Sequence, residues 1–177
     1  MTPADRPTIH ASAVRVGSHF GVLIRGPSGA GKSRLAFDLV LAGRAGQIPP
    51  TLLVGDDRIL VAREGDAVIA RPAPSLAGLI EIRGLGIRQC PFAPEAPVGL
   101  IVDLDAPDAG RLPEPDALRA VLEGIKLPRI PAGPGHSALP LVLAALITTP
   151  GPAADGRSLH DCLKGFGNHI SPTIATG

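Results

Sequence analysis

The sequence predicts an α/β fold in which a mixed β-sheet, including one β-hairpin, is flanked by helices. A short β-branched strand at 21–25 runs into a glycine-rich loop, which opens an amphipathic helix at 32–43. Segments 58–64 and 67–71 are separated only by Gly65-Asp66, a turn typical of hairpins. The near-continuous apolar segment at 98–105 is typical of a buried strand. Because hairpins are uncommon in purely parallel sheets, we expect a mixed sheet.

The other elements follow from the same patterns. We expect strands at 8–15 and 51–54, and a third strand beginning at residue 79. A short helix is expected at 117–125, a stiff proline-rich connector at 128–137, and a helix at 137–149 with Pro140 in its first turn. The first helix is expected to end at Gly43, since glycine is common just past helix ends.

Length and composition fit one domain, which we place at 1–150. Residues 151–177 are mostly small or polar, and we expect them to form a loosely ordered tail. The 17 basic and 16 acidic residues give a net charge of only +1, so neither a nucleic-acid partner nor a membrane partner is expected. The longest apolar stretch is too short to span a bilayer. The only cysteines, Cys90 and Cys162, show no paired spacing, which indicates a reducing, cytoplasmic compartment.

The most specific local motif is the loop Gly26–Ser33, which has the phosphate-binding spacing G-x-x-x-x-G-K-S. Its glycines allow backbone N–H groups to converge on a phosphate, and the next helix adds its positive N-terminal end. Lys32 supplies a cation to the phosphates, and the Ser33 hydroxyl is a ligand suited to Mg²⁺. We therefore expect a nucleotide site on Gly26, Ser28, Gly29, Ala30, Gly31, Lys32 and Ser33.

A phosphate loop also needs an acidic partner at the end of a neighbouring strand. Two pairs qualify, Asp56/Asp57 after 51–54 and Asp103/Asp105 at the end of 98–105. The adjacent pair is the more informative, because neighbouring side chains point in different directions and can serve a metal and an incoming hydroxyl separately. His10 is expected near the phosphate if strands 8–15 and 21–25 pair as a hairpin.

Together these motifs resemble the C-terminal catalytic domain of HPr kinase/phosphorylase, over about residues 8–147. The resemblance lies in Ile9-His10 before the loop, in the loop itself, in Gly55-Asp56-Asp57, and in the run E-I-R-G-L-G-I at Glu81–Ile87. It implies a P-loop kinase-like fold and the transfer of phosphate from ATP, with Mg²⁺, to a serine of HPr, a phosphocarrier of a phosphotransferase system. It also implies that inorganic phosphate removes that phosphate and forms pyrophosphate.

The resemblance implies a role for each site residue. Asp56 accepts the serine proton and returns it in the reverse reaction, while His10 and Lys32 complete the catalytic set. Ser28 contacts phosphate, and the divalent metal lies among Ser33, Asp57 and Glu81. A homo-oligomer, a hexamer in relatives, is also implied.

The chain departs from the family pattern at 133–137, where Gly-Pro-Gly-His-Ser stands in place of R-P-G-R-N. It is similar to the short alphaproteobacterial form, in which HPr belongs to a regulatory phosphotransferase chain, and the additional N-terminal domain of many members is not expected. We expect no aromatic side chain beside the loop to stack on a nucleobase, and therefore weak discrimination among nucleotides.

Two other functions remain open from the residues alone: a P-loop kinase for a small molecule, and a regulatory module that senses nucleotide without catalysis. His160, Cys162 and His169 in the tail are too few for a structural metal site, and we interpret them as incidental.

Overall fold

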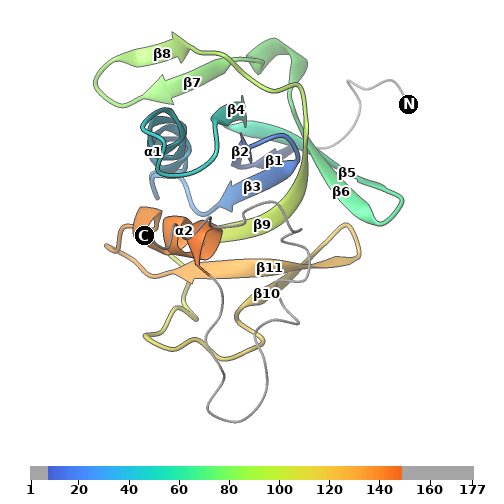
Figure 1. Cartoon of the computed structure of the whole chain (residues 1–177), viewed down its shortest axis with the longest axis vertical. Helices are drawn as coiled ribbons and strands as arrows, with labels where there is room; N and C mark the ends of the chain where they lie inside the picture. The colour runs from blue at the N-terminus through green and yellow to red at the C-terminus, as the bar shows by residue number, and fades with distance from the viewer. Residues whose placement is uncertain (1–7, 149–177) are drawn as a thin grey trace, which may run out of the picture.

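A curled, mixed β-sheet forms the centre of the molecule and carries its two α-helices on one face (Figure 1). The computed structural model describes residues 8–148. The predicted α/β class, with a mixed sheet, a hairpin and flanking helices, is confirmed. The elements in chain order are β1 (Thr8–His10), β2 (Ser12–Val16), β3 (Phe20–Arg25), α1 (Lys32–Arg44), β4 (Thr51–Gly55), β5 (Arg58–Glu64), β6 (Ala67–Pro72), a 3₁₀ turn (Pro74–Leu76), β7 (Leu79–Ile82), β8 (Gly86–Gln89), β9 (Ala96–Leu104), β10 (Arg119–Leu122), β11 (Ile125–Ala132) and α2 (Leu139–Ile147).

The strand directions gather the ends of several strands at one edge of the sheet. The strand order is β1-β5-β6-β9-β3-β2-β4, and β11 joins the sheet beside β9. Strand β3 is parallel to β9, and β9 is parallel to β11. Strand β2 is antiparallel to both β3 and β4, so β3 and β4 run in the same direction. The carboxyl ends of β3, β4, β9 and β11 therefore meet at the edge where the glycine-rich loop begins, which is where parallel α/β sheets bind ligands.

The expected strand at 8–15 is two strands. Ala11, which is fully buried, separates them, and its N–H donates to the carbonyl of Asp57. Strand β2 forms the expected hairpin with β3, whereas β1 pairs with β5. His10 therefore lies next to the start of β5 rather than on the hairpin with β3.

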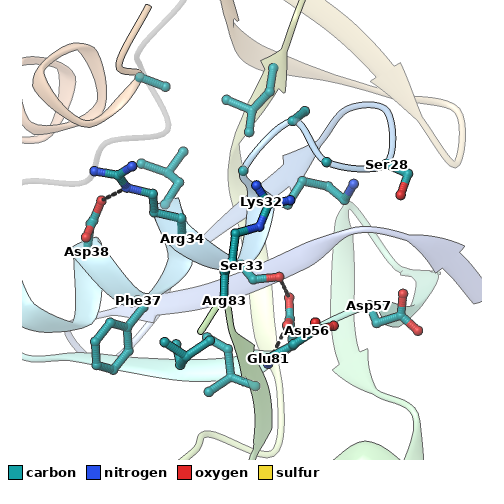
Figure 2. A pocket seen from close by; sticks show the side chains of 18 of the residues that line it. Ser28, Lys32, Ser33, Arg34, Phe37, Asp38, Asp56, Asp57, Glu81 and Arg83 are labelled. Carbon is teal, nitrogen blue, oxygen red and sulfur yellow. Dashed lines mark hydrogen bonds and ion pairs between the residues drawn. The ribbon is translucent and has the colours of Figure 1, made fainter. Parts of the chain in front are cut away.

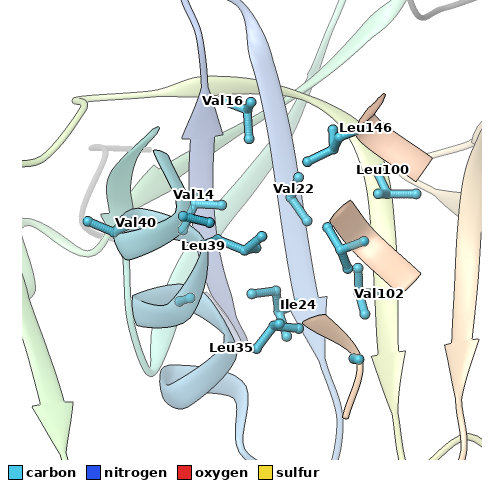
Figure 3. Close-up of a cluster of buried hydrophobic side chains, with 14 of the residues drawn as sticks. Val14, Val16, Val22, Ile24, Leu35, Leu39, Val40, Leu100, Val102 and Leu146 are labelled. Carbon is cyan, nitrogen blue, oxygen red and sulfur yellow. The ribbon is translucent and has the colours of Figure 1, made fainter. Parts of the chain in front are cut away.

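The two faces of the sheet are covered differently. Helices α1 and α2 pack on one face, where Val14, Val22 and Ile24 meet Leu39 of α1 and Leu146 of α2 (Figure 3). On the other face, the curl of the sheet brings β5 and β6 over the centre, and a second apolar cluster fills the space. Alternation along the strands supplies both clusters, because successive side chains point to opposite faces.

Helix α1 ends one residue later than predicted, and Gly43 does not end it. The N–H of Gly46 donates to the carbonyl of Gly43, and the N–H of Gln47 donates to that of Ala42, the pair of bonds that closes a Schellman motif. Gly46 has the left-handed φ of 71° that this motif needs. Gly43 instead permits close packing, since a Cβ there would lie 2.6 Å from the backbone nitrogen of Thr51.

The prediction of a helix at 117–125 is wrong, because this segment belongs to the hairpin of β10 and β11. Glu123 and Gly124 both have positive φ, which is the type I′ geometry of a two-residue hairpin turn. Residues 128–132, expected in a connector, continue β11 and pair with β9. The pattern was misleading because Glu-Gly is a weaker turn signal than Asn-Gly or Asp-Gly.

The other expected strands are present, and the helix expected at 137–149 is present but shorter, at Leu139–Ile147. Glu64 and Ala67 close the β5–β6 hairpin around Gly65-Asp66, and α2 has its proline at the start. Within residues 8–148, no helix is both long enough and apolar enough to cross a membrane. The tail at 151–177 lies outside the described residues.

Candidate active site

The glycine-rich loop joins β3 to α1, in the strand–loop–helix context that the sequence predicts. Gly29 and Gly31 have φ values of 81° and 96°, and a Cβ at either position would meet nothing within 4 Å. The loop is therefore an open concavity whose backbone has a conformation that suits glycine. Because the first turn of α1 contains no acidic residue, the positive end of the helix stays available to an anion.

Lys32 lies under the loop, with only 6% of its surface exposed. Its ammonium donates to the carbonyls of Gly26 and Pro27 at 2.9 and 2.8 Å. Burial lowers the pKa of Lys32, while the nearby charges of Asp56 and Asp57 act in the opposite direction. The lysine thus holds the loop in shape and carries its cation at the base of the site.

Asp56 is the buried carboxylate of the site, at 5% exposure. Its Oδ1 accepts from the Ser33 hydroxyl at 2.9 Å and also from the Ser12 hydroxyl, while its Oδ2 accepts from the Glu81 N–H at 3.2 Å. Figure 2 shows Ser33 and Asp56 pointing toward each other. Among residues 8–148, none of the Lys, Arg and His side chains forms an ion pair with Asp56.

Asp57 faces away from Ser33 and toward His10. It has a φ of 68°, a left-handed conformation that aspartate tolerates, and this turns the two neighbouring carboxylates in different directions. Its Oδ1 lies 3.3 Å from His10 Nε2, and the two side chains are 62% and 52% exposed. The oxygen Oδ2 lies 3.9 Å from Arg58 Nε. Asp57 is therefore the accessible carboxylate of the pair.

The run Glu81–Ile87 comprises the turn of the β7–β8 hairpin and the strand ends that flank it, and this hairpin stands beside α1 (Figure 1). Ile80 is buried in the core that α1 also shares, so the hairpin is fixed at its base. The Glu81 side chain is exposed and lines the cleft, and its backbone bonds to Asp56.

These parts enclose one cleft of about 1090 Å³. It brings together most of the predicted site residues, namely His10, Ser28, Gly29, Ala30, Gly31, Lys32, Ser33, Asp56, Asp57 and Glu81. Gly26 contributes through its carbonyl, which accepts from Lys32. The volume is sufficient for a nucleotide together with part of a second substrate.

The other predicted acids do not line this cleft. Asp103 is held by Arg25 at 2.7 Å and by Arg129 at 2.5 Å. Burial raises the pKa of Asp103, but the hydrogen bonds and charges of the two arginines outweigh it and leave the pKa below its ordinary value. Asp105 is exposed at the end of β9. The choice between the two acidic pairs therefore falls on Asp56 and Asp57.

Sequence reasoning missed three contributors to the site. Ser12, fully buried, bonds to Asp56, and no motif marks it. Residues 135–139, which comprise the end of a loop with His136 and the first residue of α2, also line the cleft. Phe37 of α1 also lines the same cleft (Figure 2). Its position one turn into α1 was the available signal.

The oxygen atoms of Ser33 and Asp56 suit a hard cation such as Mg²⁺, which binds one or two protein ligands together with substrate phosphates and water. No cluster of three or more His, Cys, Asp or Glu side chains that could hold a metal occurs within residues 8–148. His160, Cys162 and His169 lie outside the described residues.

Comparison with known proteins gives consistent matches. Residues 2–91 match the family model of the HPr serine kinase C-terminal domain. HPr kinase/phosphorylase from Mycoplasma mycoides is 41% identical over 91 residues, which is 48% of this chain and 27% of the relative. The enzyme of the same name from an Exiguobacterium strain is 32% identical over 130 residues, covering 66% of this chain and 40% of the relative. The matched regions thus span well under half of these relatives.

A solved structure gives a match over more of the chain. The HPr(Ser) kinase/phosphatase from Coxiella burnetii has a TM-score of 0.62 and 27% identity, over 80% of this chain and 94% of that one.

Proposed function

Because the chain belongs to the family of the HPr serine kinase C-terminal domain, we propose that it phosphorylates a serine of an HPr-type phosphocarrier protein with ATP. We propose further that it removes the phosphate again with inorganic phosphate. The observation that carries the proposal is that the carboxylates of Asp56 and Asp57 have different partners. One carboxylate is bonded to the phosphate-loop serine at 2.9 Å, and the other lies beside His10 at 3.3 Å, open to an incoming substrate.

These contacts favour exchanging the two roles that sequence reasoning gave to the aspartates. Asp56 is buried against Ser33, where a metal ligand is needed, whereas Asp57 is accessible, where a base must meet a protein serine. Our proposal therefore has Asp57 as the base and Asp56 on the metal side, with Glu81 facing the same cleft. His10 and Lys32 keep their predicted roles.

In the forward direction the seryl oxygen bonds to the γ-phosphorus of ATP. The bond from that phosphorus to the β–γ bridging oxygen breaks, ADP leaves, and the seryl proton passes to the Asp57 carboxylate. Lys32 and the loop N–H groups neutralise and align the phosphates, which is the main work in phosphoryl transfer. His10 lies beside Asp57 and keeps its carboxylate turned toward the cleft.

In the reverse direction an oxygen of inorganic phosphate bonds to the phosphorus of phosphoserine, and the bond from phosphorus to the seryl oxygen breaks. The seryl oxygen takes a proton from Asp57, and pyrophosphate leaves. A loop that grips phosphate through backbone N–H groups holds either ATP or inorganic phosphate, so one site serves both directions.

Mg²⁺ would be held by Ser33 and Asp56, and when bound it would neutralise charge on the phosphates. We propose that the reaction takes place in the cytoplasm and that the chain forms a homo-oligomer, as sequence reasoning implied.

The test uses HPr-type protein, Mg²⁺ and ATP, with intact-mass and peptide mass spectrometry of the carrier. We expect one serine to gain a phosphoryl group, and Asp57→Asn to lose activity by about 10²- to 10⁴-fold while still binding nucleotide. Transfer to small alcohols but not to HPr would instead indicate a small-molecule kinase. Nucleotide binding without any transfer would indicate a sensing module.

A further inference from the structure

A second cleft, of about 640 Å³, adjoins the nucleotide cleft at Asp57. It is lined by Thr8, His10, Ser28, Asp57 and Arg58. Three of these residues, His10, Ser28 and Asp57, also line the nucleotide cleft. The two clefts therefore meet at the tip of the phosphate loop and at the carboxylate that we propose as the base.

Strand pairing fixes Arg58 in this second cleft. In the antiparallel pair of β1 and β5, His10 lies directly opposite Arg58, so their side chains leave the sheet on the same face. The backbone there is well anchored, since the N–H of Arg58 donates to the carbonyl of Asp56 and the N–H of Ala73 donates to the carbonyl of Arg58. Arg58 is thus a fixed part of the cleft wall, and only its long side chain is free to adjust.

The guanidinium of Arg58 is available to a ligand. Its side chain is 67% exposed, and its ion pair with Asp57 is long, at 3.9 Å. Lys32, by contrast, is buried and already bonded to two loop carbonyls. The two cations therefore line different clefts, Lys32 the nucleotide cleft and Arg58 the second cleft.

This arrangement answers an electrostatic need of the reverse reaction. A phosphoserine dianion must approach Asp57 closely, and two negative groups at that distance repel each other. A guanidinium on the same side offsets the repulsion and presents paired N–H donors to phosphate oxygens.

Resting on the function proposed above, we propose that the second cleft is the acceptor-side subsite and that Arg58 binds the phosphate oxygens of phosphoserine on the carrier protein. Arg58 then discriminates between the phosphorylated and unphosphorylated carrier. It favours capture of the phosphorylated form in the reverse direction, and it slows release of the product in the forward direction.

The test compares Arg58→Gln with wild type and with Arg63→Gln. Arg63 is a matched control, because it is an exposed arginine on the same strand whose Nε bonds to the carbonyl of Gly65 at the hairpin turn. The carrier is phosphorylated by the wild-type enzyme, and calorimetry gives the Kd of each variant for the phosphorylated carrier, for the unphosphorylated carrier and for inorganic phosphate alone. Thermal unfolding checks that each variant is folded.

We expect Arg58→Gln to weaken binding of the phosphorylated carrier by roughly 10- to 100-fold, the size of a lost charge-assisted contact. Binding of the unphosphorylated carrier should change less than about threefold, Arg58→Lys should fall between, and Arg63→Gln should match wild type. Three results for Arg58→Gln would each overturn the inference. They are equal weakening of the binding of both carrier forms, a change in the binding of inorganic phosphate but of neither carrier form, and no change in any of the three Kd values. If wild-type enzyme fails to phosphorylate the carrier at all, the proposed function fails first.

Discussion

Two aspartates lie at the carboxyl ends of β4 and β9, two strands that run in the same direction and end at the same edge of the sheet, and their surroundings are opposite. Asp56, after β4, accepts hydrogen bonds from two hydroxyls and one backbone N–H. Asp103, at the end of β9, is held between Arg25 and Arg129. Arg129 in turn bonds to Asp108 and to the carbonyl of Ala117, which ties the loop after β9 to the sheet.

The two sets of partners differ in how far they neutralise the negative charge of the carboxylate. Neutral donors orient Asp56, and the nearby Lys32 ammonium bonds to the loop carbonyls rather than to this carboxylate, so Asp56 can still attract a metal cation. The two guanidinium groups neutralise Asp103, so its charge is used within the fold. Position at the end of an apolar strand is therefore a weak indication of function, and the partners of the carboxylate decide which of the two is a site residue.

The largest effect should come from removing the charge of Asp56. Asp56→Asn keeps the shape of the side chain but lowers the affinity for a divalent cation, so phosphotransfer should fall by about 100-fold or more. Steady-state kinetics at several Mg²⁺ concentrations measure this, and the loss should be smaller at high Mg²⁺. If the activity of Asp56→Asn stays within a few-fold of wild type, Asp56 is not the site residue that the comparison with Asp103 makes it.

The matched change at the other aspartate should act on stability. Asp103→Asn leaves Arg25 and Arg129 without their shared counter-charge in a mostly buried position, so the free energy of unfolding should fall by about 2 kcal/mol. Urea titration followed by circular dichroism measures it. At a temperature where the variant is fully folded, its phosphotransfer rate should stay within about threefold of wild type. A rate loss equal to that of Asp56→Asn contradicts the assignment.

Acid should reduce the difference between wild type and Asp103→Asn. Since the pKa of Asp103 is lowered in the folded state, its contribution to stability is complete above the ordinary aspartate pKa of about 4 and is lost as pH falls below that value. The two proteins should therefore differ most at pH 6 to 7, about two units or more above that pKa, and converge toward pH 3. Urea titrations across this range measure the difference, and a constant difference would show that Asp103 is not neutralised as described.

The smallest effect should come from Ser12→Ala. This change removes one buried donor to Asp56 but leaves Ser33 and the Glu81 N–H in place. We expect a loss of about 1 kcal/mol in stability and a decrease in activity of at most about tenfold. Parallel unfolding and kinetic measurements separate the two effects. A loss of activity as large as that of Asp56→Asn would mean that Ser12 does more than orient the carboxylate.

The sequence predicted what is local and left open what depends on tertiary contacts. The loop at Gly26–Ser33, the β5–β6 hairpin and both helices follow from spacing and turn residues within short windows. The partners of Asp56 and Asp103 come from other strands, so no pattern along the chain distinguishes them. The helix expected at 117–125 failed for a related reason, since pairing of β11 with β9 outweighs a weak local preference.

The roles of Asp56 and Asp57 are a sharper example. Both are adjacent acids after an apolar strand, and only the left-handed φ of Asp57 turns one toward Ser33 and the other toward His10. Ser12 was missed because a buried serine on a strand carries no motif of its own.

The most direct test is the Mg²⁺ dependence of nucleotide binding, measured by calorimetry with a non-hydrolysable ATP analogue in wild type, Asp56→Asn and Asp103→Asn. We expect Mg²⁺ to tighten binding by a similar factor in wild type and Asp103→Asn, and to have little effect in Asp56→Asn. If Asp56→Asn retains the full gain from Mg²⁺, the carboxylate after β4 does not hold the cation, and the division between the two aspartates is wrong.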